Sequence, residues 1–258
     1  MENISCGVIL AAGEGGRMRP LTDYYSKVTL PIFDKPLLIY HLETMKMIGI
    51  EKVFIVVSKN NFRMVQEFVD IYHSNSCDIT CELVLQEFPR GTGHALQILE
   101  KQLNGNRFLM LLGDEYYNDV DSFKMIKLNN KDSMILGVVE YENIEQISAG
   151  CNVQIKDNYV SRLVEKPTEK QIKSRWCWDG SVVLDATIFE ALHELNELNP
   201  FKEKDNLCIV KAMQRLLDNK HRLAVLKKKC RNINITTDLD YIEACLIEIK
   251  KKYGSKVI

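Results

Sequence analysis

Basic side chains follow closely on a glycine-rich turn near the N-terminus. Gly13, Gly15 and Gly16 have no side chain beyond hydrogen, so the backbone there can approach a ligand with its N–H groups facing phosphate oxygens. Arg17 and Lys27 come next in the sequence and supply fixed positive charge. This combination predicts a loop that binds a polyphosphate.

Three kinds of phosphate-binding loop compete for this stretch. A Rossmann dinucleotide loop needs a third glycine where Met18 stands, a helix where Pro20 stands, and an acidic residue where the next predicted strand ends in Ser58. A P-loop needs Gly-Lys-Ser/Thr, which is absent from the stretch. The loop of nucleotidyltransferases, G-x-G-x-R followed by a lysine before Leu-Pro, is matched by GEGGR at 13–17 and SKVTLP at 26–31. The third interpretation is favoured.

On these residues the chain resembles the sugar-nucleotide pyrophosphorylases, especially the glucose-1-phosphate thymidylyltransferase branch. Matching residues continue through nearly the whole chain. Two positions depart from the usual pattern, since Gly16 stands where threonine is usual and Val28 where proline is common. Neither departure removes a charge.

The segment from Gln86 to Ala95, QEFPRGTGHA, follows a predicted strand and opens a predicted helix, with Thr92 expected as its N-cap. The resemblance implies that Gln86 reads the edge of a nucleobase and Gly91 meets its face. The sequence of this segment also resembles the uridylyltransferase branch acting on N-acetylglucosamine 1-phosphate, so the identity of the nucleobase stays open. The resemblance implies these nucleotide-binding residues: Leu10, Ala12, Gly13, Gly15, Gly16, Gln86, Gly91 and Thr92.

A single carboxylate, Asp114, ends the apolar strand LMLLG. Beside a phosphate-binding loop such a carboxylate suits Mg²⁺, which takes one or two carboxylates together with phosphate oxygens. Glu115 stands where the family usually has asparagine, and either adds negative charge there or faces solvent. The resemblance implies a second metal ligand at Asn234; the alternative is that its amide only hydrogen-bonds its neighbours.

The tripeptide Glu165-Lys166-Pro167 ends another predicted strand. Without the resemblance, Glu165 and Lys166 are interpreted as an ordinary pair of charged residues at the surface. With it, Glu165 accepts hydrogen bonds from the acceptor's hydroxyls and Lys166 holds the acceptor phosphate, while Gly150 and Gly180 lie against the acceptor. Trp176 and Trp178 are expected in the core or in a cavity wall.

The resemblance implies a nucleotidyltransferase that condenses an NTP (UTP, dTTP, CTP or GTP) with a sugar 1-phosphate, with Mg²⁺ as cofactor and Arg17, Lys27 and Lys166 as catalytic residues. Three alternatives stay open. They are a cytidylyltransferase acting on a phospho-alcohol or phosphonate, a guanylyltransferase acting on mannose or heptose phosphate, and a non-catalytic nucleotide-sugar-binding regulatory protein. Because relatives are often dimers or tetramers, the chain could also form a homo-oligomer.

Composition excludes several other classes of protein. The 258 residues carry 34 Lys plus Arg against 35 Asp plus Glu, a net charge of −1, which argues against nucleic-acid binding through phosphates. The basic tract 227–229 is interpreted as a solvated strand end or turn. Eight cysteines without paired zinc spacing, together with no signal peptide and no apolar run of ~20 residues, predict a cytoplasmic protein with free thiols that does not cross a membrane.

The predicted site residues can lie together only if the fold brings the loops that carry them to one edge of a sheet. Up to about residue 115, strand-like and helical segments alternate, with strands expected at 8–12, 52–57, 79–85 and 107–112 and helices at 38–49, 60–72 and 92–103. This predicts an α/β fold with a Rossmann-like, predominantly parallel central sheet and helices on both faces, and the resemblance implies that the fold is GT-A-like, as in nucleotidyltransferases.

The second half has a different pattern. Strands at 133–140, 151–155, 159–164 and 176–184 have short connections, which predicts mixed or antiparallel pairing and a hairpin turn at 156–158. Helices are expected at 186–195, 206–219 and 238–251. We expect a single domain over 1–258, in which residues 1–115 bind nucleotide and residues 116–258 bind the acceptor.

Overall fold

The structure is a computed structural model. It describes residues 4–75, 79–103, 105–128, 132, 134–198 and 206–254. Cys77, one of the eight cysteines, lies outside the described residues, as do Ser133 at the start of one predicted strand and 199–205 before a predicted helix.

The first half forms the predicted parallel sheet. Strands β1 (Ile4–Leu10), β4 (Lys52–Ser58), β5 (Thr80–Gln86) and β6 (Arg107–Leu112) are ordered β5-β4-β1-β6, and every neighbouring pair is parallel. Leu10 is in register with Val56 on one side and Leu112 on the other, so the carboxyl ends of these strands lie together. The loops that follow them therefore leave from one edge of the sheet.

Helices cover both faces of this sheet because side chains along β1 alternate between them. Val8 and Leu10 pack in one core cluster with α4 (Thr92–Gln97) and α5 (Glu100–Leu103). Ile9 packs in the other cluster with α2 (Leu37–Met47) and α3 (Phe62–Asn75). The prediction of one helix over 92–103 was wrong, because the chain tightens at Leu99, whose N–H bonds the Leu96 carbonyl, and α5 starts anew.

The second half continues the same sheet with mixed pairing, as predicted. β11 (Trp176–Leu184) pairs antiparallel with β6 and extends the sheet through β8 (Met134–Glu140), β12 (Leu223–Lys227), β10 (Tyr159–Glu165) and β9 (Cys151–Lys156). Helices α8 (Thr187–Leu198) and α9 (Ile209–Asp218) pack on the α4 and α5 side. The hairpin turn between β9 and β10 is confirmed, with positive φ at Asp157 and Asn158.

The interpretation of the basic tract 227–229 as a solvated strand end is confirmed for Lys227 and Lys229, which are exposed, and is wrong for Lys228. β12, which the sequence analysis did not predict, runs parallel to β8 in the interior of the sheet. Lys227 ends that strand, and the following Lys228 side chain is 2% exposed. The tract therefore carries one buried charge, which must have a partner inside the protein.

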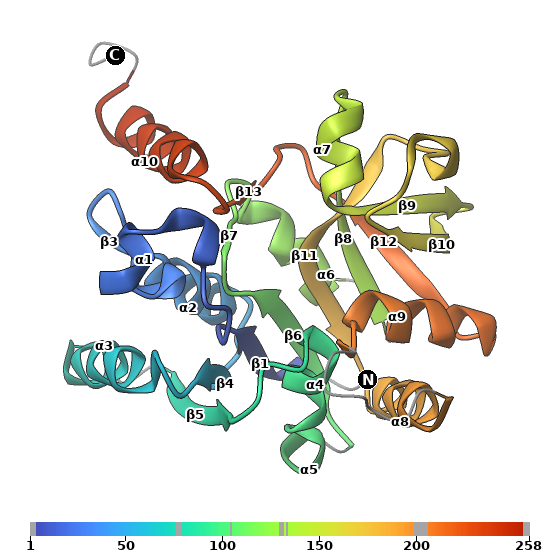
Figure 1. The fold of residues 1–258 in the computed structure, drawn as a ribbon, viewed down its shortest axis with the longest axis horizontal. Helices are drawn as coiled ribbons and strands as arrows, with labels where there is room; N and C mark the ends of the chain where they lie inside the picture. The colour runs from blue at the N-terminus through green and yellow to red at the C-terminus, as the bar shows by residue number, and fades with distance from the viewer. Residues whose placement is uncertain are drawn as a thin grey trace.

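Short elements tie the C-terminal helix α10 (Asp238–Tyr253) to the sheet. β7 (Glu115–Tyr116) follows β6 directly and pairs antiparallel with β13 (Ile233–Asn234), which precedes α10. Figure 1 shows α10 beside β13, at the opposite end of the molecule from α5 and α8. The described chain has seven further short elements: β2 (Pro31–Ile32), β3 (Lys35–Pro36), α1 (Leu21–Tyr24), α6 (Lys124–Leu128), α7 (Ile144–Ala149), and the 3-10 turns η1 (Gly16–Met18) and η2 (Lys27–Thr29). Two more 3-10 turns, η3 (Asp121–Phe123) and η4 (Glu169–Gln171), lie before α6 and after β10. None of the described helices has the length and apolarity needed to cross a membrane.

Candidate active site

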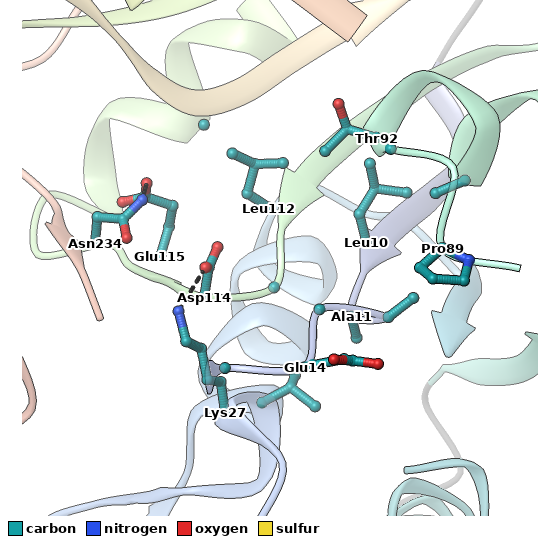
Figure 2. Close-up of a pocket in the computed structure, with 18 of the residues that line it drawn as sticks. Leu10, Ala11, Glu14, Lys27, Pro89, Thr92, Leu112, Asp114, Glu115 and Asn234 are labelled. Atoms are coloured by element: carbon teal, nitrogen blue, oxygen red, sulfur yellow. Dashed lines mark hydrogen bonds and ion pairs between the residues drawn. The ribbon is translucent and has the colours of Figure 1, made fainter. Parts of the chain in front are cut away.

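A cavity of about 530 Å³ opens at the edge where β1, β5 and β6 end (Figure 2). It is lined by residues from both halves of the sheet, including every residue predicted for the site except Gly16. The predicted residues that line it are Leu10, Ala12, Gly13, Gly15, Arg17, Lys27, Gln86, Gly91, Thr92, Asp114, Gly150, Glu165, Lys166, Gly180 and Asn234. Leu10 and Asn234, which are 224 positions apart in sequence, therefore share one cavity.

The glycine-rich turn forms one wall. β1 ends at Leu10, and the chain reverses at Gly15, whose φ of 68° lies in the left-handed region. A Cβ on Gly15 would approach the Thr22 methyl to 2.8 Å, and the Thr22 hydroxyl donates to the Gly15 carbonyl. Beyond this reversal Gly16 begins η1 and does not line the cavity. Its proposed contact with nucleotide has no support from the geometry.

Two of the predicted cations differ sharply in their surroundings. Arg17 is exposed at the cavity wall. Lys27 is buried in η2, and its Nζ lies 3.0 Å from Asp114 Oδ2, an ion pair drawn in Figure 2. This ion pair joins η2, which follows the glycine-rich turn, to the residue two positions after the end of β6.

The loop after β5 forms the opposite wall. Gln86 is buried, and its Nε2 donates to the Gly91 carbonyl at 3.2 Å and contacts His94 Nδ1 at 3.0 Å, which leaves its carbonyl oxygen for a ligand. Gly91 has a φ of 91°, and a Cβ there would meet the Leu207 carbonyl oxygen at 2.6 Å. Only glycine fits at that position.

The prediction that Thr92 is the N-cap of its helix was wrong. Gly91 occupies the N-cap position, and Thr92 is the first helical residue. The Thr92 hydroxyl instead accepts a hydrogen bond from the backbone N–H of Ile209 at 3.2 Å. Because α9 begins at Ile209, this bond attaches the wall of the cavity to the α9 helix.

The Glu165-Lys166 pair approaches from the second half of the sheet. Lys166 has a φ of 45°, a left-handed conformation that is uncommon for a residue with a side chain, and its N–H donates to the Gly150 carbonyl at 2.8 Å. Burial raises the pKa of Glu165, and the neighbouring Lys166 ammonium partly opposes that rise. Backbone strain of this kind is typical of functional sites.

Beneath Gly180 lies a buried polar cluster that the sequence analysis missed. The Asp179 carboxylate forms an ion pair with the Lys228 ammonium, and Asp179 Oδ1 accepts from the Ser181 N–H and hydroxyl. Burial lowers the pKa of Lys228, while the Asp179 carboxylate opposes this. These contacts hold the irregularity in β11 where Gly180, with φ 84°, meets the cavity.

One signal for this cluster was present in the sequence. Asp179 is the only charged residue in the otherwise apolar strand Trp176–Leu184, so it needs a buried partner. The identity of that partner depends on β12 lying beside β8, and no local pattern gives that placement.

Asp114 and Asn234 provide oxygen atoms suited to a divalent metal. Asp114 Oδ2 faces Lys27, and the Asp114 side chain is about one-third exposed, so its carboxylate is accessible from the cavity. The Asn234 Oδ1 accepts from the Thr236 hydroxyl and retains a second lone pair. Among the described residues no three His, Cys, Asp or Glu side chains gather into a metal site, so a metal here would take most of its ligands from phosphates and water.

Glu115 does not face solvent. It is buried, and its two carboxylate oxygens accept hydrogen bonds from the side-chain amides of Asn234, at 2.6 Å, and Asn232. Burial raises the pKa of Glu115 well above the usual glutamate value, and the adjacent Asp114 carboxylate raises it further. Glu115 thus fixes the Asn234 amide with its nitrogen turned inward.

Comparison with known proteins agrees with this geometry. The family model described as nucleotidyl transferase matches residues 6–231. The chain belongs to this family. The resemblance to sugar-nucleotide pyrophosphorylases seen at 13–17 and 165–167 is therefore confirmed at the level of the family. Nucleotidyltransferases of this family generally use a divalent metal.

Two similar proteins illustrate the relationship within the nucleotidyl transferase family. The bifunctional protein GlmU of Methanococcus vannielii is 30% identical over 218 residues, which cover 82% of this chain and 47% of that protein. A glucose-1-phosphate thymidylyltransferase of Actinoplanes is 30% identical over 201 residues, covering 73% of this chain and 61% of that protein. The chain thus spans about half the length of the GlmU relatives it matches.

Solved structures confirm the fold class. A crystal structure of UDP-glucose pyrophosphorylase complexed with UDP-glucose superposes with a TM-score of 0.81 at 23% identity, covering 96% of this chain and 99% of that one. The inositol-1-phosphate CTP transferase from T. maritima gives a TM-score of 0.79 at 16% identity, covering 98% of each chain. These likenesses establish the architecture.

Proposed function

We propose that this nucleotidyl transferase joins an NTP to a sugar 1-phosphate, giving an NDP-sugar and pyrophosphate. The observation that carries the proposal is that Arg17, Lys27, Lys166 and Asp114 line one cavity at the carboxyl edge of the sheet. The three cations suit a polyphosphate and Asp114 suits its metal, in a cavity that Glu14, Glu115 and Glu165 also line. We also propose that residues 1–115 bind the nucleotide and residues 116–258 bind the acceptor, within a single domain.

The reaction needs positioning and charge neutralisation more than proton transfer. An oxygen of the acceptor phosphate attacks the α-phosphorus, and the bond from that phosphorus to the bridging oxygen breaks, so its electron pair leaves with pyrophosphate. A phosphate anion is already a nucleophile at neutral pH, so the protein needs no general base. Its contribution is to hold the two phosphates in line and to neutralise their charge.

Each cation has a separate task in this scheme. Arg17 binds the β- and γ-phosphates of the leaving group, and Lys27 contacts the same chain of phosphates from the other side. Lys166, whose backbone is fixed by Gly150, aims the acceptor phosphate. Asp114, with Asn234, would hold Mg²⁺, which when bound neutralises negative charge on the phosphates.

Release of pyrophosphate tests the proposal. The protein is incubated with Mg²⁺, each of UTP, dTTP, CTP and GTP, and a panel of sugar 1-phosphates. We expect one NTP to support turnover, and Arg17→Ala or Lys166→Ala to lower it about 10²–10³-fold, as loss of one oxyanion-hole donor does. Near-normal turnover in either variant would contradict the assigned role. Nucleotide binding without turnover across the panel would favour a regulatory protein.

Location and assembly are further proposals. Within the described residues no two cysteines form a disulfide, which agrees with the cytoplasmic location that we propose. We propose a homo-oligomer because related enzymes are often dimers or tetramers. Sedimentation of the protein in solution would test this by giving its oligomeric state.

A further inference from the structure

The outer side of the C-terminal helix α10 carries a row of apolar side chains. They recur at alternating intervals of three and four residues, which is the spacing of a seam between paired helices: Leu239, Ile242, Leu246, Ile249 and Tyr253. Leu239, Ile242 and Tyr253 are 77%, 49% and 54% exposed, and the other two are half-buried. Together these five residues form the α10 stripe. A contiguous exposed apolar surface of this kind marks an interaction site.

The opposite side of α10 packs on the rest of the chain. Ala244 is buried, and Tyr241 and Ile247 pack against the same core cluster. At about 100° per residue, Ile242 and Leu246 each lie about 160° around the helix from Ala244. The α10 stripe therefore points away from the protein, and Figure 1 shows α10 at the periphery of the molecule. A partner helix can lie along the stripe without meeting the body of its own neighbour.

The charges along α10 change sign from one end to the other. Asp238, Asp240 and Glu243 lie in its first half, and three lysines at 250–252 form its last turn. Glu248 is acidic in the second half, but it faces the protein, where its carboxylate accepts hydrogen bonds from two tyrosine hydroxyls. Two copies of α10 side by side in parallel would place like charges together, whereas an antiparallel pair places acidic residues against lysines. The charge order therefore fits a second copy of this chain.

An antiparallel pair about a two-fold axis also brings the apolar residues into register. With the axis at Leu246, this residue meets its own counterpart in the second copy. Ile242 then lies opposite the partner's Ile249, and Leu239 lies opposite the partner's Tyr253. All five residues of the α10 stripe are thus covered by a second stripe, and each copy uses the same surface.

The same register sets opposite charges beside the α10 stripe. Glu243 and Lys250 lie on one flank of the stripe, seven residues apart, and antiparallel pairing sets Glu243 opposite the partner's Lys250. Glu243 contacts Arg231 through only one carboxylate oxygen, so the other oxygen can accept a hydrogen bond from the partner's Lys250. The two-fold axis forms this contact twice.

We propose that the α10 stripe is a dimer interface, on which a second copy of this chain docks with its α10 antiparallel to the first. The inference goes beyond the proposed catalytic function and does not depend on it. It gives the proposed homo-oligomer a defined surface. Because α10 has 16 residues and is about 24 Å long, the interface is small, and we expect a Kd on the order of 10 µM.

Sedimentation velocity of the full chain between about 1 and 200 µM measures this dimer. Ile242→Lys should raise the Kd at least 100-fold, because it places a charge in the apolar seam twice per dimer. Ile242 is exposed in the single chain, so the variant should keep its fold, which circular dichroism checks. The matched control is Ile71→Lys, at a 58% exposed isoleucine of α3, and it should leave the Kd unchanged.

Two charge reversals test the antiparallel orientation. Glu243→Lys and Lys250→Glu each set like charges opposite one another at both contacts, so each variant alone should dimerise about tenfold more weakly. An equimolar mixture of the two variants has opposite charges at both contacts and should form heterodimers with nearly the affinity of the unsubstituted protein. The lost contact between Glu243 and Arg231 cannot explain such a recovery, because that contact is absent from the mixture as well.

The remaining outcomes overturn the proposal. A chain that stays monomeric at about 200 µM has no such interface, and a dimer that resists Ile242→Lys uses another surface. Single charge variants that dimerise normally would exclude the antiparallel orientation. Vesicles of phosphatidylcholine and phosphatidylserine test a lipid occupant, and binding that Ile242→Lys abolishes would assign the stripe to a membrane surface instead. Ile242 does not line the candidate active site, so pyrophosphate release by Ile242→Lys tests the proposed function separately.

Discussion

Lys27 and Asp114 form an ion pair across the candidate active site, with 3.0 Å between Nζ and Oδ2. The lysine comes from the turn after the glycine-rich loop and the aspartate from the end of β6, and Figure 2 shows both facing the same space. The ammonium of Lys27 thus occupies the position next to Asp114 that a metal ion would share. Under the proposed function, a metal bound by Asp114 without nucleotide would compete with Lys27 for that carboxylate, whereas a nucleotide would offer Lys27 a phosphate in exchange.

Lys27→Met should therefore have opposite effects on metal binding and on turnover. We expect the nucleotide-free variant to bind Mn²⁺ on the order of tenfold more tightly, because one charge-assisted hydrogen bond to Asp114 is lost. Turnover should fall about 10²–10³-fold, because a phosphate contact is lost. Mn²⁺ titration followed by electron paramagnetic resonance measures the first effect. Lys35→Met, which breaks a surface pair with Glu43, is the control, and weaker Mn²⁺ binding by Lys27→Met would contradict the prediction.

The left-handed backbone of Lys166 predicts that Lys166→Gly is more stable than Lys166→Ala. At φ 45° glycine is relaxed and alanine is strained, so Lys166→Gly should unfold with a free energy about 1 kcal/mol higher than Lys166→Ala. Both variants lack the ammonium group and should lose turnover to a similar extent. Urea unfolding measures the stabilities. If alanine proves the more stable of the two, Lys166 does not hold this conformation in solution.

The buried pair between Lys228 and Asp179 predicts a large loss of stability that a second substitution repairs. Lys228→Met leaves the Asp179 carboxylate buried without its cation and should cost about 3–5 kcal/mol of unfolding free energy. Adding Asp179→Asn removes the unpaired charge and keeps an oxygen to accept from Ser181, so the double variant should recover at least half of the loss. Urea denaturation of the two single variants and the double variant tests this. Additive losses would show that the two residues do not interact.

His41 predicts how stability depends on pH. Its Nε2 donates to the Glu115 carbonyl at 2.8 Å, and burial lowers the pKa of His41 from 6.5 to about 4. Between those two values the unfolded chain binds a proton that the folded chain does not, so stability falls as pH decreases. From pH 7 to 5 this one residue should cost about 2 kcal/mol of unfolding free energy.

The comparison variant for that prediction is His41→Gln, which keeps an N–H donor near the same carbonyl and has no group that titrates in this range. Its unfolding free energy should decrease less between pH 7 and 5 than that of the unsubstituted protein. Equal decreases in the two proteins would mean that His41 is not the group responsible.

The sequence by itself determined the sheet of the first half and the loops that meet at its carboxyl edge. Short segments rich in apolar and β-branched residues, alternating with helical segments, specify parallel strands, and parallel strands deliver their carboxyl ends to one edge. For that reason the sequence alone places Gly13, Gln86 and Asp114 together, and the cavity lined by all three agrees with that placement.

Only the tertiary structure decided the contacts between segments that are distant in sequence. The pairing of Lys228 with Asp179 and the burial of Glu115 under two asparagines depend on where β12 and β13 lie against β8 and β7. Periodicity reports which face of an element is buried, but not which element covers it. A charge in a polar tract such as 227–229 therefore has the same local pattern whether it faces water or a buried carboxylate.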